Sequence, residues 1–155
     1  MLTDVRRAKS SYHQAETLQE AGRTMEALDL WETFLETDRQ ITGSRKGVYF
    51  RQASVSLGAI FYDRGARAYQ ADDLVMAARL WKMAAQVDPK NKEVRKGLDM
   101  LADSARKYYR DGYSLQEINP QQAIEKWKVV LEIVPPTNIY HQKARQQIER
   151  FAVIP

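Results

Sequence analysis

Three tryptophans recur in one sequence setting, and this recurrence limits the folds open to the chain more than any other feature. Apolar side chains follow each tryptophan by three and four residues, and an alanine precedes each by four. The alanine–tryptophan pairs are Ala27 and Trp31, Ala77 and Trp81, and Ala123 and Trp127. These offsets place the alanine, the indole and the following apolar groups on one helical face. The pattern therefore predicts three helices that each bury a tryptophan.

A second helix is predicted upstream of each tryptophan helix. A tyrosine precedes each tryptophan by 18 or 19 residues, and a small residue follows each tyrosine by three. The pairs are Tyr12 and Ala15, Tyr62 and Gly65, and Tyr109 and Gly112. A small residue lets a neighbouring helix approach closely, and aromatic rings fill the space beside it. The segments FYDRGA (61–66) and YYRDGY (108–113) are therefore interpreted as one structural element, and most aromatic side chains as core.

Turn signals separate the two helices of each unit. Gly22 suits the left-handed conformation that ends a helix. Asp72 or Asp73 can cap the second tryptophan helix. Asn119 and Pro120 supply a cap and a favoured first-turn residue for the third. Because these signals agree with the aromatic register, they predict a helical hairpin in each unit.

The hairpin pattern resembles the tetratricopeptide repeat (TPR) family. In that family, small and aromatic residues on a first helix face an Ala-x-x-x-aromatic motif on a second helix, which a later proline follows. The resemblance is clearest from Gly65 to Pro89 and from Gly112 to Pro135. It implies an all-α, TPR-like solenoid of antiparallel helical hairpins. The tryptophans are 50 and 46 residues apart, whereas the family repeats every 34 or so residues, so we expect some unusually long helices.

We predict a single TPR-like repeat domain over residues 1–155, either a whole protein or a piece of a longer one. Apolar and small residues continue at intervals of three and four from Val94 to Leu115 and, less regularly, from Phe50 to Ala68, which places the extra length in the first helices. The units are 3–40, 45–89 and 91–135, with a closing helix at 138–152. The seven predicted helices are 3–21, 24–38, 45–70, 73–87, 91–118, 120–134 and 138–152.

The resemblance implies a non-catalytic protein–protein interaction module within a bacterial signalling, secretion or motility assembly. Such arrays receive an extended peptide or a partner helix on the concave face formed by their first helices. Asparagines of the family's carboxylate clamp are missing from the matching positions, so a looser basic groove is expected. Its arginines would pair with carboxylates or phosphates, and its tyrosines would be apolar anchors. The expected partner-binding residues are Arg64, Arg67, Tyr69, Arg106, Arg110 and Tyr113.

Two other functions stay open from the sequence alone. The apolar terminal segment FAVIP (151–155) suits a homo-oligomer, and hence a structural self-assembly element of a multiprotein complex. The net charge of +4, from 24 Lys and Arg against 20 acids, allows nucleic-acid binding through basic helix faces. However, acids interrupt the basic clusters, as in residues 90–96, and such interleaving is typical of solvated helix faces. Nucleic acid is therefore an unlikely partner by this criterion.

Catalytic and metal-binding motifs are missing from the sequence. There is no cysteine, and neither His13 nor His141 belongs to a metal-ligand spacing. Capping explains the Asp72–Asp73 pair, and no phosphate-binding glycine loop or nucleophile motif occurs. No apolar run has the length of a membrane span, and no signal peptide is visible. We therefore expect a cytoplasmic protein that is not an enzyme and needs no cofactor or metal.

Overall fold

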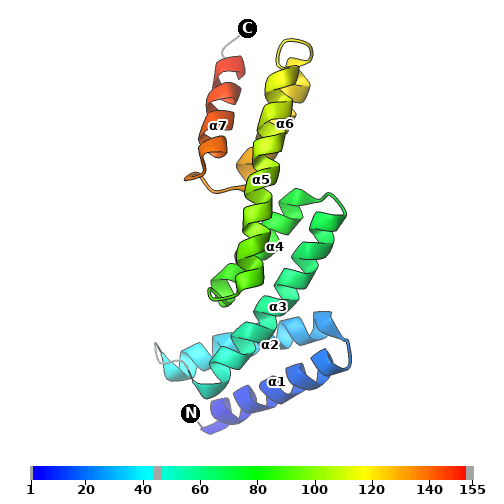
Figure 1. Cartoon of the computed structure of the whole chain (residues 1–155). Coiled ribbons are helices and arrows are strands. Elements are labelled where there is room, and N and C mark those ends of the chain that lie inside the picture. Colours follow the sequence, from blue (N-terminus) through cyan, green and yellow to red (C-terminus); the bar gives the residue numbers. More distant parts are fainter. Residues whose placement is uncertain (1, 44–46, 153–155) are drawn as a thin grey trace. The chain divides into compact units, whose positions relative to one another are not determined.

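The computed structural model describes residues 2–43 and 47–152, and every regular element within them is an α-helix (Figure 1). The seven helices of these residues are α1 (Leu2–Glu20), α2 (Thr24–Thr42), α3 (Val48–Gln70), α4 (Leu74–Val87), α5 (Lys92–Leu115), α6 (Pro120–Ile133) and α7 (Ile139–Ala152). The predicted all-α class is confirmed for the described residues, and each described helix corresponds to one predicted from the sequence.

Two predicted C-terminal helix ends were wrong, and the predicted start of the third helix at residue 45 lies outside the described residues. Helix α2 continues to Thr42 instead of ending near residue 38, because residues 24–42 contain no glycine or proline and the helix ends at Gly43, whose φ is 64°. Helix α5 ends at Leu115 instead of residue 118, and the amide N–H groups of Ile118 and Asn119 both donate to the Leu115 carbonyl. These bonds close a turn and stop the helix earlier than its apolar pattern indicated.

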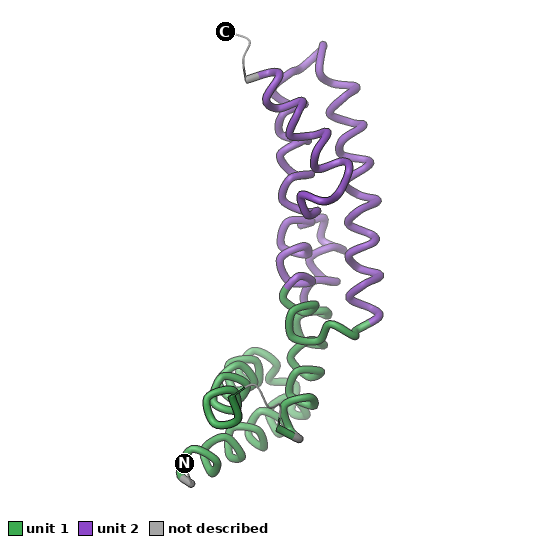
Figure 2. Tube along the Cα trace, turned by 90° about the vertical axis from the view of Figure 1, so that its left-hand side faces the viewer, with its two compact units in different colours: residues 1–63, 83–91 green, residues 64–82, 92–155 purple. Residues whose placement is uncertain are grey.

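Contacts divide the chain into two compact units (Figure 2). Unit 1 comprises residues 1–63 and 83–91, with α1, α2, the first part of α3 and the end of α4. Unit 2 comprises residues 64–82 and 92–155, with the rest of α3 and α4 and all of α5, α6 and α7. Trp31 belongs to unit 1, whereas Trp81 and Trp127 belong to unit 2. The single repeat domain over residues 1–155 stays a prediction.

All three tryptophans are buried core residues, as predicted. Trp31, Trp81 and Trp127 keep only 1%, 2% and 0% of their surface exposed, and they lie on α2, α4 and α6. In unit 1, the Tyr12 ring of α1 meets the Trp31 indole edge-on, with the ring centroids 5.1 Å apart. The Trp31 Nε1–H donates to Gln19 Oε1 at 2.9 Å. Helices α1 and α2 are therefore joined by aromatic packing and a satisfied indole N–H.

Glycines bring the helices of unit 2 close to its two indoles. A Cβ atom on Gly65 of α3 would lie 2.6 Å from Trp81 Cδ1, and one on Gly97 of α5 would lie 2.8 Å from Trp81 Cδ2. A Cβ atom on Gly112 of α5 would lie 2.5 Å from Trp127 Nε1. No larger side chain fits these contacts without displacing an indole. The predicted roles of Gly65 and Gly112 are confirmed, whereas the sequence did not reveal Gly97.

The tyrosines follow the repeat less closely than the tryptophans. Tyr12 is buried as predicted, but Tyr62 and Tyr109 are only partly buried. The Tyr109 ring lies against Tyr113 and Tyr140, and it is the Tyr109 carbonyl oxygen that accepts from Trp127 Nε1–H, at 3.1 Å. The prediction of equivalent core positions for the three tyrosines was therefore wrong in detail, because helix contacts differ from one hairpin to the next.

The first two hairpins share one turn geometry. Gly22 and Asp72 both have positive φ, 73° and 61°. The residues that follow them, Arg23 and Asp73, donate their amide N–H groups to the carbonyls five residues earlier, the hydrogen bond of a Schellman helix end. Of the two aspartates considered for capping, Asp73 is the cap, because its Oδ1 accepts from the Met76 N–H at 3.0 Å. Asp72 instead supplies the left-handed residue.

We expect Asn119→Ala to lower the free energy of unfolding by about 1 kcal/mol. The Asn119 side chain is the cap of α6, where its Oδ1 accepts from the Gln122 N–H at 3.1 Å and Pro120 follows in the first turn. Alanine leaves that N–H to solvent. Urea unfolding followed by circular dichroism measures the loss. Glu117→Ala, at a neighbouring exposed position, is the control, and equal effects of the two variants would contradict the capping role.

The C-terminal helix packs through the first residue of the FAVIP segment. The Phe151 ring of α7 lies 5.6 Å from the Trp127 ring, between centroids. Residues 153–155, on which the predicted self-association depends, lie outside the described residues.

None of the helices formed by the described residues combines the length and the apolar character that crossing a membrane requires.

Candidate partner-binding surface on helix α5

The six residues predicted to bind a partner all lie in unit 2, in two groups. Arg64, Arg67 and Tyr69 are on the last turns of α3, and Arg106, Arg110 and Tyr113 are on α5. The three α5 residues follow one another at intervals of four and three, so they share one helical face. All three are exposed. The α5 group therefore presents two guanidinium groups and a phenol to solvent on a single face.

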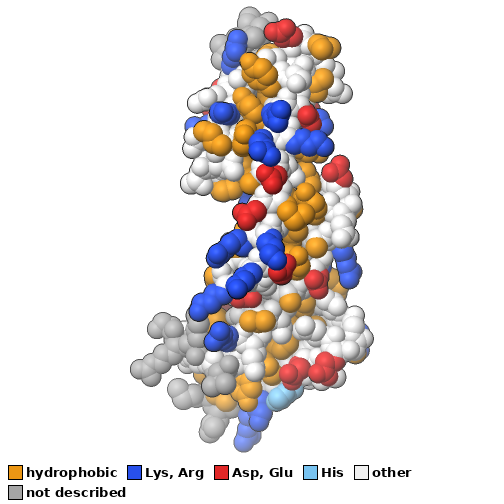
Figure 3. Space-filling view, viewed as in Figure 1, with side chains coloured by type: hydrophobic (Ala, Val, Ile, Leu, Met, Phe, Trp, Pro, Cys, Tyr) orange, Lys and Arg blue, Asp and Glu red, His pale blue; other side chains and the backbone are white. Residues whose placement is uncertain are grey.

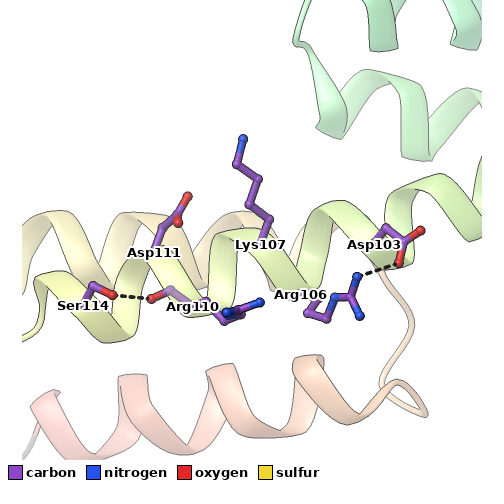
Figure 4. Close-up of a pocket in the computed structure, with 6 residues that line it drawn as sticks. All are labelled: Asp103, Arg106, Lys107, Arg110, Asp111 and Ser114. Carbon is purple, nitrogen blue, oxygen red and sulfur yellow. Dashed lines mark hydrogen bonds and ion pairs between the residues drawn. The ribbon is translucent and has the colours of Figure 1, made fainter.

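A shallow hollow on α5 is lined by charged side chains (Figure 4). Its lining residues are Asp103, Arg106, Lys107, Arg110, Asp111 and Ser114. Figure 4 shows the Arg106 and Arg110 side chains on one side of the helix, with Lys107 and Asp111 projecting from the other. The lining thus combines three cations with two carboxylates and one hydroxyl group, and it carries net positive charge.

The cations of this hollow differ in how far other groups neutralise them. Arg106 Nη2 lies 3.5 Å from Asp103 Oδ1, an exposed pair of the kind that contributes little to stability. Arg110 and Lys107 form no ion pair with any residue that the structure describes. The Arg110 guanidinium and the Lys107 ammonium are therefore free to bind an anion from outside the chain.

Three tyrosines extend this surface from α5 to α7. The Tyr113 side chain is exposed (53% for the residue), and its ring centroid lies 6.4 Å from that of Tyr109. The Tyr109 ring lies 5.7 Å from the Tyr140 ring on α7, and Lys143 Nζ lies 5.7 Å from the centroid of that ring. These partly exposed rings offer apolar contact area beside the cations. We call Arg106, Arg110, Tyr109 and Tyr113 the basic–aromatic face; Lys107 projects from the other side of α5.

The α3 group has a different environment. The Tyr69 ring stacks on Trp81 with centroids 5.5 Å apart, and its hydroxyl lies 3.3 Å from Ser104 Oγ of α5. The ring therefore connects α3 to α4 and α5 within unit 2. Arg64 is partly buried and Arg67 is exposed. None of these three residues lines the α5 hollow, so the structure gathers only part of the predicted set around it.

The opposite side of α5 is attached to α6 through Tyr108. Lys126 Nζ of α6 lies 4.7 Å from the centroid of the Tyr108 ring. Burial raises the pKa of the Tyr108 hydroxyl, and the negative charges of Asp72 and Asp111 raise that pKa further. The phenol therefore stays neutral at physiological pH, and Lys126 is engaged with the ring face. This arrangement fixes α5 while leaving the basic–aromatic face exposed.

Sequence reasoning missed Tyr109 as a member of this surface and Lys107 as a cation of the adjoining hollow. Lys107 follows Arg106 directly, so a search for basic residues on α5 would have included it. The Tyr109–Tyr140 contact depends on how α7 packs on α5, and no spacing within the sequence reports it. Figure 3 shows Lys and Arg side chains gathered over the upper part of α5, beside hydrophobic side chains.

The basic–aromatic face is equipped for reversible binding, because its guanidinium groups can pair with anions and its phenol rings offer apolar contact area. Within residues 2–43 and 47–152, no group of three or more His, Cys, Asp or Glu side chains is placed to hold a metal ion. A scan against protein-family models and a search of curated proteins found no match to the chain. Membership of the TPR family therefore stays a prediction.

Proposed function

We propose that the chain is a non-catalytic protein-interaction module whose basic–aromatic face binds an acidic segment of a partner protein. The observation that carries the proposal is the exposure of Arg110, without any ion pair to a described residue, three residues from the exposed Tyr113 on the same face of α5. Arginine and tyrosine are among the residue types enriched where protein surfaces bind partners.

The spacing of the two arginines suits both conformations considered for the partner. Arg106 and Arg110 are four residues apart on α5, which corresponds to about 6 Å along the helix axis. Alternate side chains of an extended peptide are separated by roughly 7 Å, and residues four apart on a partner helix by about 6 Å. Two carboxylates at either spacing can each pair with one guanidinium group.

The proposal includes a long-helix TPR-like architecture of stacked helical hairpins. Two observations support it: the shared turn of the first two hairpins, with Gly22 and Asp72 at equivalent positions, and the packing of Gly65 and Gly112 against tryptophans. The proposal that the chain belongs to a bacterial signalling, secretion or motility assembly rests on the family resemblance alone. A partner would be sought among the proteins of such assemblies.

We expect the double variant Arg106→Ala/Arg110→Ala to weaken binding of an acidic peptide about threefold to tenfold, because each lost ion pair on an exposed surface contributes roughly 0.2–1 kcal/mol. The probe is a fluorescein-labelled peptide of alternating Glu and Tyr residues, titrated with the full chain and followed by fluorescence anisotropy. The unfolding free energy should change by less than about 0.5 kcal/mol, since both side chains are exposed.

Arg79→Ala/Arg95→Ala is the matched control, because it removes two positive charges at exposed positions of the same unit outside the α5 hollow. Equal weakening by this control would assign the binding to overall charge and contradict the proposal. Tighter binding of a random-sequence oligonucleotide, with steep salt dependence, would favour nucleic acid as the partner. An oligomer that light scattering detects and that Arg106→Glu/Arg110→Glu dissociates would favour self-assembly through this face.

A further inference from the structure

Unit 1 carries a second hollow, separate from the α5 face and lined by a different set of residues. One wall is the start of α3, and the other is the end of α4 with the turn that follows it. The lining residues are Gly47, Phe50, Arg51, Ser54, Val55, Val87, Asp88, Pro89 and Lys90. Its volume of about 710 Å³ falls within the usual range for binding pockets, about 300–1,000 Å³.

The walls of this hollow expose apolar side chains. Val55 keeps 48% of its surface exposed, and Phe50 and Val87 are partly exposed. Pro89 is exposed on the turn after α4. Transfer of a valine or phenylalanine side chain out of water is favourable, by about 1.5–3 kcal/mol when the side chain becomes fully buried. A partner that covered this hollow with apolar groups would therefore be stabilised by their burial.

Cations stand on both walls. Arg51 lies on α3 and Lys90 follows α4, both are exposed, and neither forms an ion pair with any residue that the structure describes. The Asp88 carboxylate is the one acid among the lining residues. A Cβ atom placed on Gly47 would lie 2.8 Å from Asp38 Oδ1, so a carboxylate already occupies the start of α3. We therefore assign the attraction for anions to Arg51 and Lys90 and not to the helix terminus.

The shape of the hollow is held by a close helix approach. A Cβ atom on Gly58 of α3 would lie 2.8 Å from the Asp88 Cβ atom. The Asp88 N–H donates to the Ala84 carbonyl at 2.9 Å, and the Asn91 N–H donates to the Asp88 carbonyl at 3.1 Å. These bonds fix the turn that carries Asp88, Pro89 and Lys90. The hollow is thus formed in the free chain and does not require a partner to shape it.

We infer that this hollow is a second protein-binding site, which takes an acidic amphipathic helix from a partner protein. A partner helix supplies apolar side chains at intervals of three and four for Phe50, Val55 and Val87, and flanking Asp or Glu residues for Arg51 and Lys90. The Asp88 carboxylate disfavours a purely anionic ligand such as a fatty acid, whereas a peptide also brings hydrogen-bond donors. The chain would then bind partners through two separate surfaces, one in each unit.

The test uses a fluorescein-labelled helical peptide of about five turns, with Leu on one face and Glu on the flanks. Fluorescence anisotropy with the full chain should show saturable binding. Arg51→Glu/Lys90→Glu should weaken that binding at least about tenfold, and Val55→Asp should weaken it as well. Arg6→Glu/Lys9→Glu makes the same change of net charge at exposed positions of α1 and should alter the affinity less than about twofold.

Each alternative result would overturn the inference. If the same peptide with Lys in place of Glu bound equally well, Arg51 and Lys90 would not be attracting the acidic residues of the peptide. Absence of saturable binding at millimolar peptide would show that the hollow does not bind such a helix. Loss of binding in Arg106→Glu/Arg110→Glu, with none in Arg51→Glu/Lys90→Glu, would place the peptide on α5 and leave the proposed function standing. Displacement of the bound peptide by laurate would assign the hollow to an anionic lipid.

Discussion

Replacement of Trp127 by alanine is expected to lower the free energy of unfolding by about 3–5 kcal/mol, the usual cost of truncating a buried aromatic residue. The Trp127 side chain is fully buried, and its ring lies against Phe151 of α7 and the backbone of Gly112. Alanine removes the apolar surface and leaves a cavity between α5, α6 and α7. Because packing in the protein interior is dense, the surrounding helices close such a cavity only in part.

Urea unfolding of the full chain, followed by circular dichroism at the helical band, gives the change for Trp127→Ala. Trp127→Phe is the informative companion, because it keeps most of the apolar surface but removes the N–H that donates to the Tyr109 carbonyl. We expect its cost to be smaller. Trp81→Ala should resemble Trp127→Ala, since Trp81 is equally buried. Losses below about 1 kcal/mol in both alanine variants would show that the indoles are not packed as described.

The helices and their tryptophan cores could be predicted from the sequence because both depend on local spacing. Four-residue offsets between alanine and tryptophan define a helical face wherever the helix lies. Gly22, Asp73 and Asn119 mark helix ends through backbone geometry and side-chain hydrogen bonds that involve only neighbouring residues. Information of this kind is contained in a few consecutive positions, so it survives without any knowledge of tertiary contacts.

Contacts between distant residues were harder to predict. Tyr69 was assigned to partner binding, but its ring stacks on Trp81 and its hydroxyl lies beside Ser104, 35 residues away. Gly97 lies outside the repeat register, yet it meets Trp81 almost as closely as Gly65 does. Both cases depend on how α5 packs against the preceding hairpin. The sequence specifies that each residue suits close packing but not which neighbour it meets.

The two candidate surfaces also differ in whether they could be predicted from residues close together in the sequence. Arg106, Arg110 and Tyr113 were predicted because the family resemblance implies that the first helix of each hairpin binds the partner, and all three are exposed on α5. The unit 1 hollow was not predicted, because its walls come from residues 47–55 and 87–90. Neither segment has a binding motif, and Gly58 is the residue at which helix α3 approaches Asp88 closely.

Gly112→Ala is expected to destabilise the protein by about 1–2 kcal/mol, although alanine is the better helix former. In a helix interior, exchanging glycine for alanine favours folding by about 0.5–1 kcal/mol. At Gly112 the added Cβ atom would lie 2.5 Å from Nε1 and 2.9 Å from Cδ1 of the buried Trp127. Forcing an extra methyl group into a filled core costs about 1–3 kcal/mol, so the steric cost outweighs the helical gain. Urea unfolding measures the sign directly.

A double-mutant cycle separates this steric cost from every other effect of the substitution. In the Trp127→Ala background the indole is absent, so the Gly112→Ala methyl group enters the vacated space. There it should stabilise the protein by about 0.5–1 kcal/mol through helix propensity, which reverses the sign seen with Trp127 present. The interaction free energy between the two positions should therefore exceed about 1 kcal/mol. Additive effects would mean that Gly112 and Trp127 are not in contact, and the close approach of α5 to α6 would be incorrect.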